Sequence, residues 1–159
     1  MVRDQKVVQN FQTPSLEDIP VISRADVERL EATADPGAWT RNGMDYVVLR
    51  TLGRRTGKET KVALPVWYDA DDHRIVVASF AGAPRHPDWY LNLADRERNP
   101  EVLCKVAGRA YWSAQEILTG DDYRTVWDQL TADRAWYLDY QARTDRQIPL
   151  VRLPETRPA

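Results

Sequence analysis

The sequence predicts an α+β fold in which an antiparallel sheet or a small barrel is flanked by helices. Short β-branched and aromatic runs follow one another with turn residues between them, as in strands connected by hairpins. Helical patterns are confined to the start of the chain and to two later segments, whereas a doubly wound parallel sheet requires a helix between most strand pairs. Most strands are therefore consecutive, which favours mainly antiparallel pairing.

The first elements are an arm and a short helix. Residues 1–22 have weak periodicity and contain Pro14 and Pro20, so we interpret them as an N-terminal arm that precedes one domain at residues 23–159. A helix is expected to begin at Ser23 and to end before a Pro-Gly pair. The apolar positions on one face of this helix are Ile22, Val27, Leu30 and Ala34.

The following elements are strands and two further helices. Valine-rich or aromatic runs predict the strands, and prolines, glycines and aspartates mark the turns between them. Two segments with helical spacing interrupt the strands. The expected strands are residues 46–52, 62–68, 74–80, 101–106, 110–118 and 148–153, and the expected helices are residues 88–93 and 120–141.

The composition excludes several classes of function. With 159 residues and a formal charge of −2, the chain fits one folded domain and has no protein-wide basic field for a nucleic acid. Its single cysteine and two histidines supply neither an internal disulfide nor a typical structural zinc site. Charged residues throughout the first 20 positions match neither a secretory signal nor a membrane-spanning helix, so we expect a cytoplasmic protein.

A basic loop at residues 53–61 is the most informative local feature. Clustered cations attract anions even on an acidic protein, and glycines let backbone N–H groups approach a phosphate. The glycine spacing is not that of a P-loop, and a solvated basic hairpin is the alternative interpretation. The cations of this loop are Arg54, Arg55, Lys58 and Lys61.

Two further sets of residues could form a pocket. Tyr137 and Tyr140 are three positions apart in a predicted helix, so both hydroxyls could enter one cavity and donate a proton or a hydrogen bond to a developing oxyanion. Ser79 ends a predicted strand before a small-residue loop, where a flat ligand could approach the backbone. The alternatives are aromatic packing for the tyrosines and capping of a turn for the serine.

The remaining polar residues are interpreted as structural. An EF-hand register that starts at Asp69 lacks the glycine and the glutamate that calcium binding requires, so this segment is a turn. His86 lies in a loop with no cysteine or second histidine beside it, and Cys104 alternates with strand valines as a packing residue. We therefore expect no metal site and no Ser-His-Asp or Cys-His catalytic group.

An ordered set of motifs extends from about residue 46 to residue 153. The motifs are TLGRRTGK at 51–58, VVAS at 76–79, GAPRHP at 82–87, WYLNL at 89–93, NP at 99–100, DYQARTDR at 139–146 and IP at 148–149. In this order they resemble the deazaflavin-dependent nitroreductase family. The resemblance implies a split β-barrel related to flavin-reductase and FMN-binding folds, with reduced coenzyme F-420 as a hydride donor.

The resemblance also implies roles for individual residues. In the family, a basic loop binds the phosphodiester and oligoglutamate tail of the coenzyme, and the matching residues here are Arg54, Arg55, Thr56, Gly57, Lys58 and Lys61. The positions that match the ring and ribityl contacts are Ala63, Leu64, Pro65, Val66, Val77, Ala78, Ser79, Phe80, Trp89, Asn92 and Tyr137. Ser79, Tyr137 and Tyr140 match positions near the reacting ring and are the catalytic candidates, with Tyr137 as the first candidate donor.

Two positions depart from the family pattern. Arg134 stands where nitroreductases of this family commonly have a third tyrosine, and residues 61–67 differ from the Pro-Leu-Tyr-like segment of many members. Both differences fall on the expected substrate pocket. The resemblance therefore does not extend to a particular nitro substrate.

The combined hypothesis is an oxidoreductase that passes a hydride from reduced coenzyme F-420 to a quinone, an enone or a nitro-type acceptor. FMN in the same barrel is an alternative cofactor, and a carrier that binds the deazaflavin without turnover is an alternative function. The net acidity disfavours contact of the basic loop with nucleic acid or a membrane surface. The expected partner is a small-molecule acceptor, with no integral membrane segment and a peripheral membrane location if that acceptor is a lipid quinone.

Overall fold

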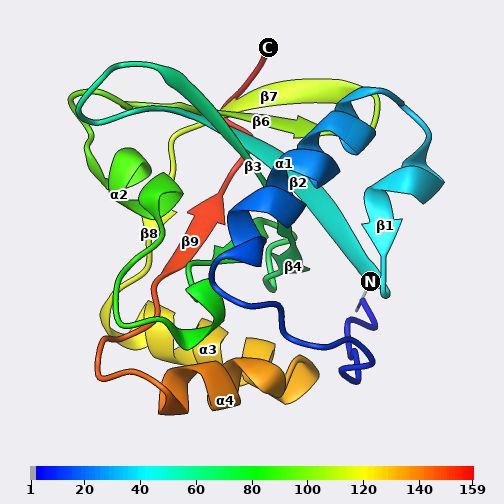
Figure 1. Ribbon diagram of the computed structural model, residues 1–159, viewed down its shortest axis with the longest axis vertical. Coiled ribbons are helices and arrows are strands. Elements are labelled where there is room, and N and C mark those ends of the chain that lie inside the picture. Colours follow the sequence, from blue (N-terminus) through cyan, green and yellow to red (C-terminus); the bar gives the residue numbers. More distant parts are fainter. Residues whose placement is uncertain (1–2) are drawn as a thin grey trace.

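Two antiparallel sheets form the centre of the molecule, and helices cover them from several sides (Figure 1). The computed structural model describes residues 3–159. Its antiparallel α+β architecture confirms the fold class expected from consecutive strands. No helix within the described residues is both long and apolar enough to cross a membrane.

The larger sheet contains six strands, in the order β1-β2-β6-β7-β10, with β3 paired to β2 beside this path. Seven residue pairs join β2 to β3, from Tyr46 opposite Pro65 to Leu52 opposite Glu59. The pairing leads directly into the basic loop, which is the turn of this hairpin. The strands are β1 (Thr40–Arg41), β2 (Met44–Leu52), β3 (Glu59–Pro65), β6 (Val102–Val106), β7 (Arg109–Ser113) and β10 (Arg157–Pro158).

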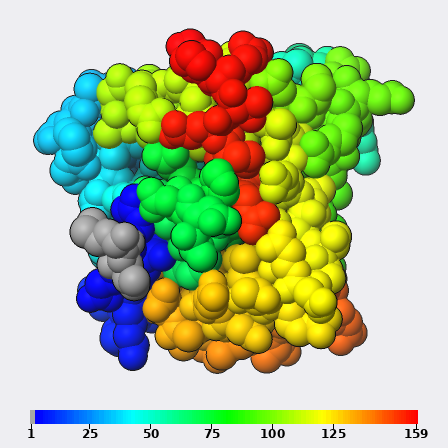
Figure 2. All heavy atoms as spheres, turned by 180° about the vertical axis from the view of Figure 1, so that it is seen from behind, coloured from blue at the N-terminus to red at the C-terminus, as the bar shows by residue number. Residues whose placement is uncertain are grey.

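The smaller sheet contains four strands in the order β4-β5-β9-β8. On the face opposite to that of Figure 1, the C-terminal segment (red) runs between the β4–β5 hairpin (green) and the residues near β8 and α3 (yellow), as Figure 2 shows. The central strands β5 and β9 supply much of the apolar core. The strands are β4 (Trp67–Tyr68), β5 (Arg74–Val77), β8 (Glu116–Ile117) and β9 (Leu150–Leu153).

Four stretches of chain pass from one sheet to the other, at β3–β4, β5–β6, β7–β8 and β9–β10. We predicted single strands at residues 62–68 and 110–118, and each of these is broken into two. The reason is geometric, because a strand must bend to leave one sheet and pair in the next. At the first bend the N–H of Val66 donates to the carbonyl of Asp45 over 2.8 Å, so a hydrogen bond is kept where the ladder ends.

The helices differ from the sequence expectation in two places. Helix α1 begins at Asp18 rather than at Ser23, because Pro20 lies in its first turn, where the missing N–H has no helical partner to lose. The single helix expected at residues 120–141 is interrupted at Arg134, whose backbone is not helical. The helices are α1 (Asp18–Glu31), α2 (Asp88–Ala94), α3 (Gly120–Asp133) and α4 (Trp136–Ala142), with short 3₁₀ helices at Pro36–Trp39 and Phe80–Gly82.

Apolar side chains form two clusters, one beneath the helices and one between the sheets. Val27 and Leu30 are buried in the first cluster, as the helical spacing predicts, whereas Ile22 is 42% exposed. Cys104 is fully buried in the second cluster beside strand valines, which confirms it as a packing residue. Burial raises the pKa of the Cys104 thiol to about 12, so this thiol is not a nucleophile at neutral pH.

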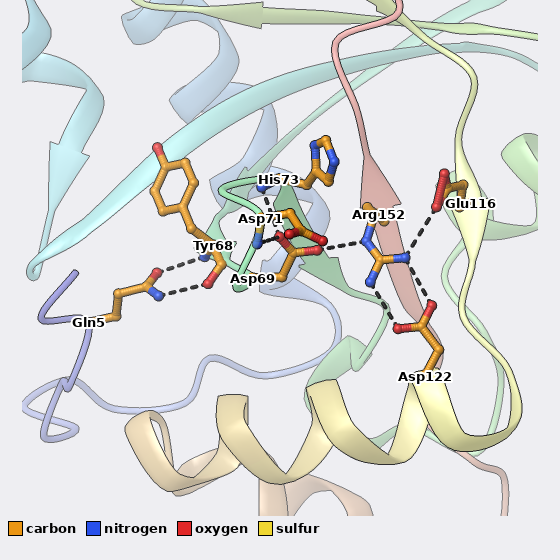
Figure 3. A network of polar contacts seen from close by, with 8 residues as sticks. All are labelled: Gln5, Tyr68, Asp69, Asp71, His73, Glu116, Asp122 and Arg152. Atoms are coloured by element: carbon orange, nitrogen blue, oxygen red, sulfur yellow. Dashed lines mark hydrogen bonds and ion pairs between the residues drawn. The ribbon is translucent and has the colours of Figure 1, made fainter. Parts of the chain in front are cut away.

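Arg152 joins the smaller sheet to α3 and to the turn after β4 (Figure 3). Its guanidinium contacts three carboxylates, at 2.7 Å from Asp69, 2.9 Å from Asp122 and 3.2 Å from Glu116. Asp69 also accepts hydrogen bonds from the backbone N–H groups of Asp71 and His73, which closes the turn. The segment interpreted as a turn therefore has a structural role.

Replacing Arg152 is expected to destabilise the fold. The change Arg152→Met leaves the buried Asp69 carboxylate without its cation, and urea denaturation at pH 7 should show a loss of about 2–3 kcal/mol, between the values for exposed and buried pairs. The Arg152 guanidinium holds the pKa of Asp122 below its usual range, so this part of the stability is present above about pH 4 and is lost as pH falls through the lowered value. The difference in free energy of unfolding between the wild type and Arg152→Met should therefore become smaller below pH 4.

The matched control for this prediction is Arg124→Met. The Arg124 side chain is 71% exposed, and within residues 3–159 its one ion pair is with Asp121, at 3.6 Å. This control should change stability by less than about 0.5 kcal/mol. A loss in the control equal to that in Arg152→Met would contradict the structural role assigned to Arg152.

Candidate active site

A cavity of about 1060 Å³ is lined by the N-terminal segment and α1 and by residues of β3, α2 and α4. These elements can be followed in Figure 1, where α1 crosses in front of β2 and β3. The walls are mainly apolar, and the polar residues Glu59, Thr60 and Lys61 lie at the end where β3 begins. The cavity thus extends from an apolar interior toward the basic loop.

The structure brings together most of the predicted ring contacts and separates two of them. Val66 and Ala78 directly follow β3 and β5 and are buried in the protein interior, whereas their neighbours Pro65 and Val77 line the cavity. The predicted residues that line the cavity are Lys61, Ala63, Leu64, Pro65, Val77, Ser79, Phe80, Trp89, Asn92, Tyr137 and Tyr140. The predicted residues that do not line it are Arg54, Arg55, Thr56, Gly57, Lys58, Val66 and Ala78.

The basic loop is a tight turn beyond the cavity. The N–H of Gly53 donates to the carbonyl of Lys58 over 2.7 Å, and the N–H of Gly57 donates to the carbonyl of Gly53 over 2.8 Å. Gly57 has a φ of +70°, and a Cβ at this position would meet a guanidinium nitrogen of Arg98. Arg98 therefore adds a cation from the segment after α2, which the linear sequence did not associate with the loop.

Carboxylates neutralise part of this positive charge. Lys61 lies 3.1 Å from Glu31 and 3.7 Å from Glu59, and Arg54 lies 3.3 Å from Asp88. Arg55 and Lys58 are exposed and have no ion pair within residues 3–159. An anionic ligand at this loop would consequently meet Arg55 and Lys58 without displacing a carboxylate.

Two buried asparagines fix the loop to α2. The Asn92 amide oxygen accepts from the backbone N–H of Arg54 at 3.1 Å and from its guanidinium at 2.9 Å. The Asn99 amide both accepts from the N–H of Leu52 and donates to its carbonyl, at 2.7 and 2.8 Å. Asn92 also borders the cavity, so it connects the position of the basic loop to the cavity wall.

The two tyrosines lie together at the edge of α4. Their ring centroids are 5.9 Å apart in an edge-to-face arrangement, and both side chains are buried at 5% and 7% exposure. Burial raises the pKa of Tyr137 to about 12, opposed by the nearby positive charge of Arg134, so the Tyr137 hydroxyl keeps its proton at neutral pH. The Tyr140 hydroxyl lies 2.9 Å from the hydroxyl of Thr13. Both tyrosines are therefore packed in the protein interior and also line the cavity.

Ser79 begins a short turn with an unusual backbone. Phe80 and Ala81 have φ values of +44° and +52°, in the left-handed region that side-chain-bearing residues rarely adopt. Ser79 precedes this turn but its side chain makes no capping hydrogen bond, so the capping alternative is not observed. Its side chain is one of those lining the cavity.

The N-terminal segment supplies residues that the sequence reasoning missed. Phe11 lines the cavity and packs edge to face on Trp136, with ring centroids 5.3 Å apart. Gln5 anchors the same segment, since its side-chain amide exchanges two hydrogen bonds with the backbone of Tyr68 at 2.7 and 2.8 Å (Figure 3). The only sequence signal for the contact of Phe11 with Trp136 was the presence of an aromatic residue in a polar arm with weak periodicity.

Comparison with known proteins shows the family of this chain. A family model described as F420H(2)-dependent quinone reductase matches residues 22–155. The chain belongs to this family. The F420H(2)-dependent quinone reductase Rv1261c of Mycobacterium tuberculosis is 34% identical over 108 residues, which cover 66% of this chain and 70% of the relative. The family found here agrees with the deazaflavin resemblance of the ordered motifs.

Solved structures show the same relationship. One described as an F420-H2 dependent reductase, FDR-A, is 28% identical with a TM-score of 0.57, and covers 69% of this chain and 93% of its own. Another, described as a domain-swapped dimer, is 26% identical with a TM-score of 0.60, and covers 82% of this chain and 96% of its own. The fold of this quinone reductase family member is therefore shared with proteins of known structure.

The geometry fits the large anionic cofactor that the family name implies. A cavity of about 1060 Å³ is at the upper end of ligand-pocket volumes and could hold a ring together with a second small molecule. Apolar residues on β3 and β5 suit a flat ring, and unpaired cations lie beyond the polar end of the cavity.

Removing the Asn92 amide is expected to loosen the basic loop. The change Asn92→Ala deletes the acceptor for two donors of Arg54 and should lower the free energy of unfolding by about 1–3 kcal/mol. Hydrogen exchange should accelerate in residues 53–58. The exposed Asn10→Ala is the control and should leave both quantities unchanged. Unaltered exchange in the loop of Asn92→Ala would show that Asn92 does not hold it.

Proposed function

We propose that this protein transfers a hydride from reduced coenzyme F-420 to a quinone, with enones or nitro compounds as further activated acceptors. The observation that carries the proposal is a pair of unpaired loop cations, Arg55 and Lys58, just before the β3 residues Glu59–Lys61 that line one end of a mainly apolar cavity. A deazaflavin ring joined to a phosphodiester and an oligoglutamate tail has the same division between flat apolar and anionic parts. The family match supports the same cofactor.

Hydride chemistry would come from the bound coenzyme, whereas the chain would supply orientation, shielding and a proton. Ala63, Leu64 and Val77 form walls on which a ring can lie flat. Trp89 and Phe11 enclose the cavity from α2 and from the N-terminal segment, which reduces access of water. Arg55 and Lys58 would bind the anionic tail, and Lys61 would join them by exchanging a carboxylate partner.

Tyr137 is the proposed proton or hydrogen-bond donor to the acceptor. Its hydroxyl is protonated at neutral pH and its side chain borders the cavity. When a carbonyl of the acceptor gains a hydride equivalent, negative charge develops on its oxygen, and a fixed hydroxyl stabilises that charge. We assign Tyr140 and Ser79 supporting positions on the same wall, where they would orient the acceptor or the ring.

The same proposal includes the finer architecture. We propose that the two sheets are the halves of a split barrel formed by residues 23–159, since four stretches of chain pass between them. The arm at residues 1–22 would form the wall opposite β3. If the acceptor is a lipid quinone, the protein would work in the cytoplasm at the membrane surface. FMN binding and a carrier function without turnover are the outcomes that the following experiments would reveal instead.

Binding is expected to depend on the coenzyme tail. A fluorescence titration with oxidised F-420 should give at least tenfold tighter binding than the same titration with the tail-less chromophore, because only the full coenzyme reaches Arg55 and Lys58. The difference should shrink at high salt as the loop charges are screened. Equal affinity for both ligands, or retention of FMN but not of F-420 during gel filtration, would contradict the proposal.

Two variants should separate binding from turnover. Tyr137→Phe should lower the rate of menadione reduction by 10²-fold or more with little change in F-420 affinity, since it removes only a donor used during reaction. Arg55→Ala should weaken F-420 binding with little change in the rate at saturation. The rate is measured as loss of reduced F-420 by absorbance, and a rate no faster than without protein would favour the carrier function.

A further inference from the structure

Arg146 lies between α4 and β9, outside the set of residues assigned to the site, and its guanidinium is used almost entirely by backbone carbonyls. Nη2 donates to the carbonyl of Ser79 at 2.7 Å, Nε donates to that of Ala83 at 2.8 Å, and Nη1 donates to that of Ala78 at 3.2 Å. Nη1 also lies 3.1 Å from Nδ1 of His86. One side chain thus contacts both ends of the segment 78–86.

No carboxylate forms an ion pair with Arg146 in the described part of the chain, which distinguishes it from Arg152 with its three carboxylates. Burial lowers the pKa of Arg146, which nevertheless stays charged because an arginine pKa is far above neutrality. A planar guanidinium offers five N–H donors in a fixed fork, and lysine offers a point charge instead. The contacts seen here require that fork.

The segment that Arg146 holds carries backbone strain. Phe80 and Ala81 have positive φ values although both carry side chains, a conformation that is unfavourable for L-residues. A conformation of this kind persists only where its surroundings fix it. Gly82 allows close packing here, since a Cβ at Gly82 would overlap the carbonyl oxygen of Tyr140 in α4.

The orientation of the carbonyls fixes the orientation of the N–H groups. In a trans peptide the C=O and the following N–H point in opposite directions, and the chain has no cis peptide among its described residues. Because Arg146 draws the carbonyls of Ala78 and Ser79 toward itself, the N–H groups of Ser79 and Phe80 point away from it. Neither N–H is bonded to another group within residues 3–159.

These two N–H groups belong to residues that line the cavity. Ser79 is in the right-handed and Phe80 in the left-handed region, the pairing that forms a backbone concavity for anions and carbonyl oxygens. We infer that Arg146 is a positioning residue, which holds segment 78–83 so that the N–H groups of Ser79 and Phe80 can donate to an oxygen of the ring-shaped ligand. The identity of the ligand rests on the proposed function, whereas the role of Arg146 rests on its own contacts.

Two variants test this role in the cofactor-free protein. Arg146→Ala and Arg146→Lys should each accelerate hydrogen exchange at the N–H groups of Gly82 and Ala83 at least tenfold, because these groups bond to Ser79 and Phe80 within the turn. The lysine variant keeps the charge and most of the stem, so it tests the fork and not the cation. Addition of guanidinium at millimolar concentration should restore slow exchange in Arg146→Ala, whereas methylammonium should not.

Ligand binding provides the second measurement. Both variants should bind oxidised F-420 about 10- to 100-fold more weakly, the effect of losing one or two aligned hydrogen bonds, while the full coenzyme keeps its advantage over the tail-less chromophore. Arg124→Ala is the matched control and should behave as the wild type, since that arginine is exposed, pairs with Asp121 on α3 and does not line the cavity.

The outcomes separate the two proposals. Exchange and binding at wild-type levels in both variants, or full recovery in Arg146→Lys, would overturn the positioning role. Absence of F-420 binding by the wild type would overturn the proposed function alone, and the exchange measurement with guanidinium would still decide the role of Arg146.

Discussion

The passage of strands between two sheets is the constraint on which this structure depends. Where the chain passes from β3 to β4, the pairing of β3 with β2 ends and a space opens beside the bend. Helix α1 covers the open edge of β3, and the Ser23 hydroxyl accepts a hydrogen bond from the N–H of Ala63 at 3.1 Å. The cavity is the remaining space between that helix, the edge strand and α4. Its position therefore follows from how the sheets are joined.

Charge is distributed so that a site for anions exists on an acidic protein. Most cations near the β2–β3 turn have carboxylate partners, and these pairs contribute little net attraction for a ligand. The exceptions within residues 3–159 are Arg55 and Lys58 in the turn and Arg98 beside it, and all three are exposed to solvent. Asn92 and Asn99 hold the turn from below through buried hydrogen bonds. The turn therefore has a base held by buried hydrogen bonds and unpaired charges at its exposed end.

The cavity walls combine rigid and strained parts. Tyr137 and Tyr140 are packed on α4, and the Thr13 contact links the second tyrosine to the N-terminal segment. The part of the wall next to α4 includes the turn at Phe80, whose backbone is held by the side chain of Arg146 through the neighbouring carbonyls. Each part thus depends on a residue far away in the sequence, Thr13 for Tyr140 and Arg146 for the turn at Phe80. A change in one of these supports would alter the pocket without touching a ligand.

The sequence by itself determined the elements and the residue types. Strand periodicity and turn residues predicted most strands, the helix at residues 88–93 and the basic hairpin, because these depend on neighbouring residues. The ordered motifs also indicated the family. Only the tertiary structure decided where single strands bend, which loop cations are neutralised and which residues face the cavity. Those properties depend on contacts such as Lys61 with Glu31 and Arg146 with Ser79, which join positions 30 and 67 residues apart and leave no periodic signal in the chain.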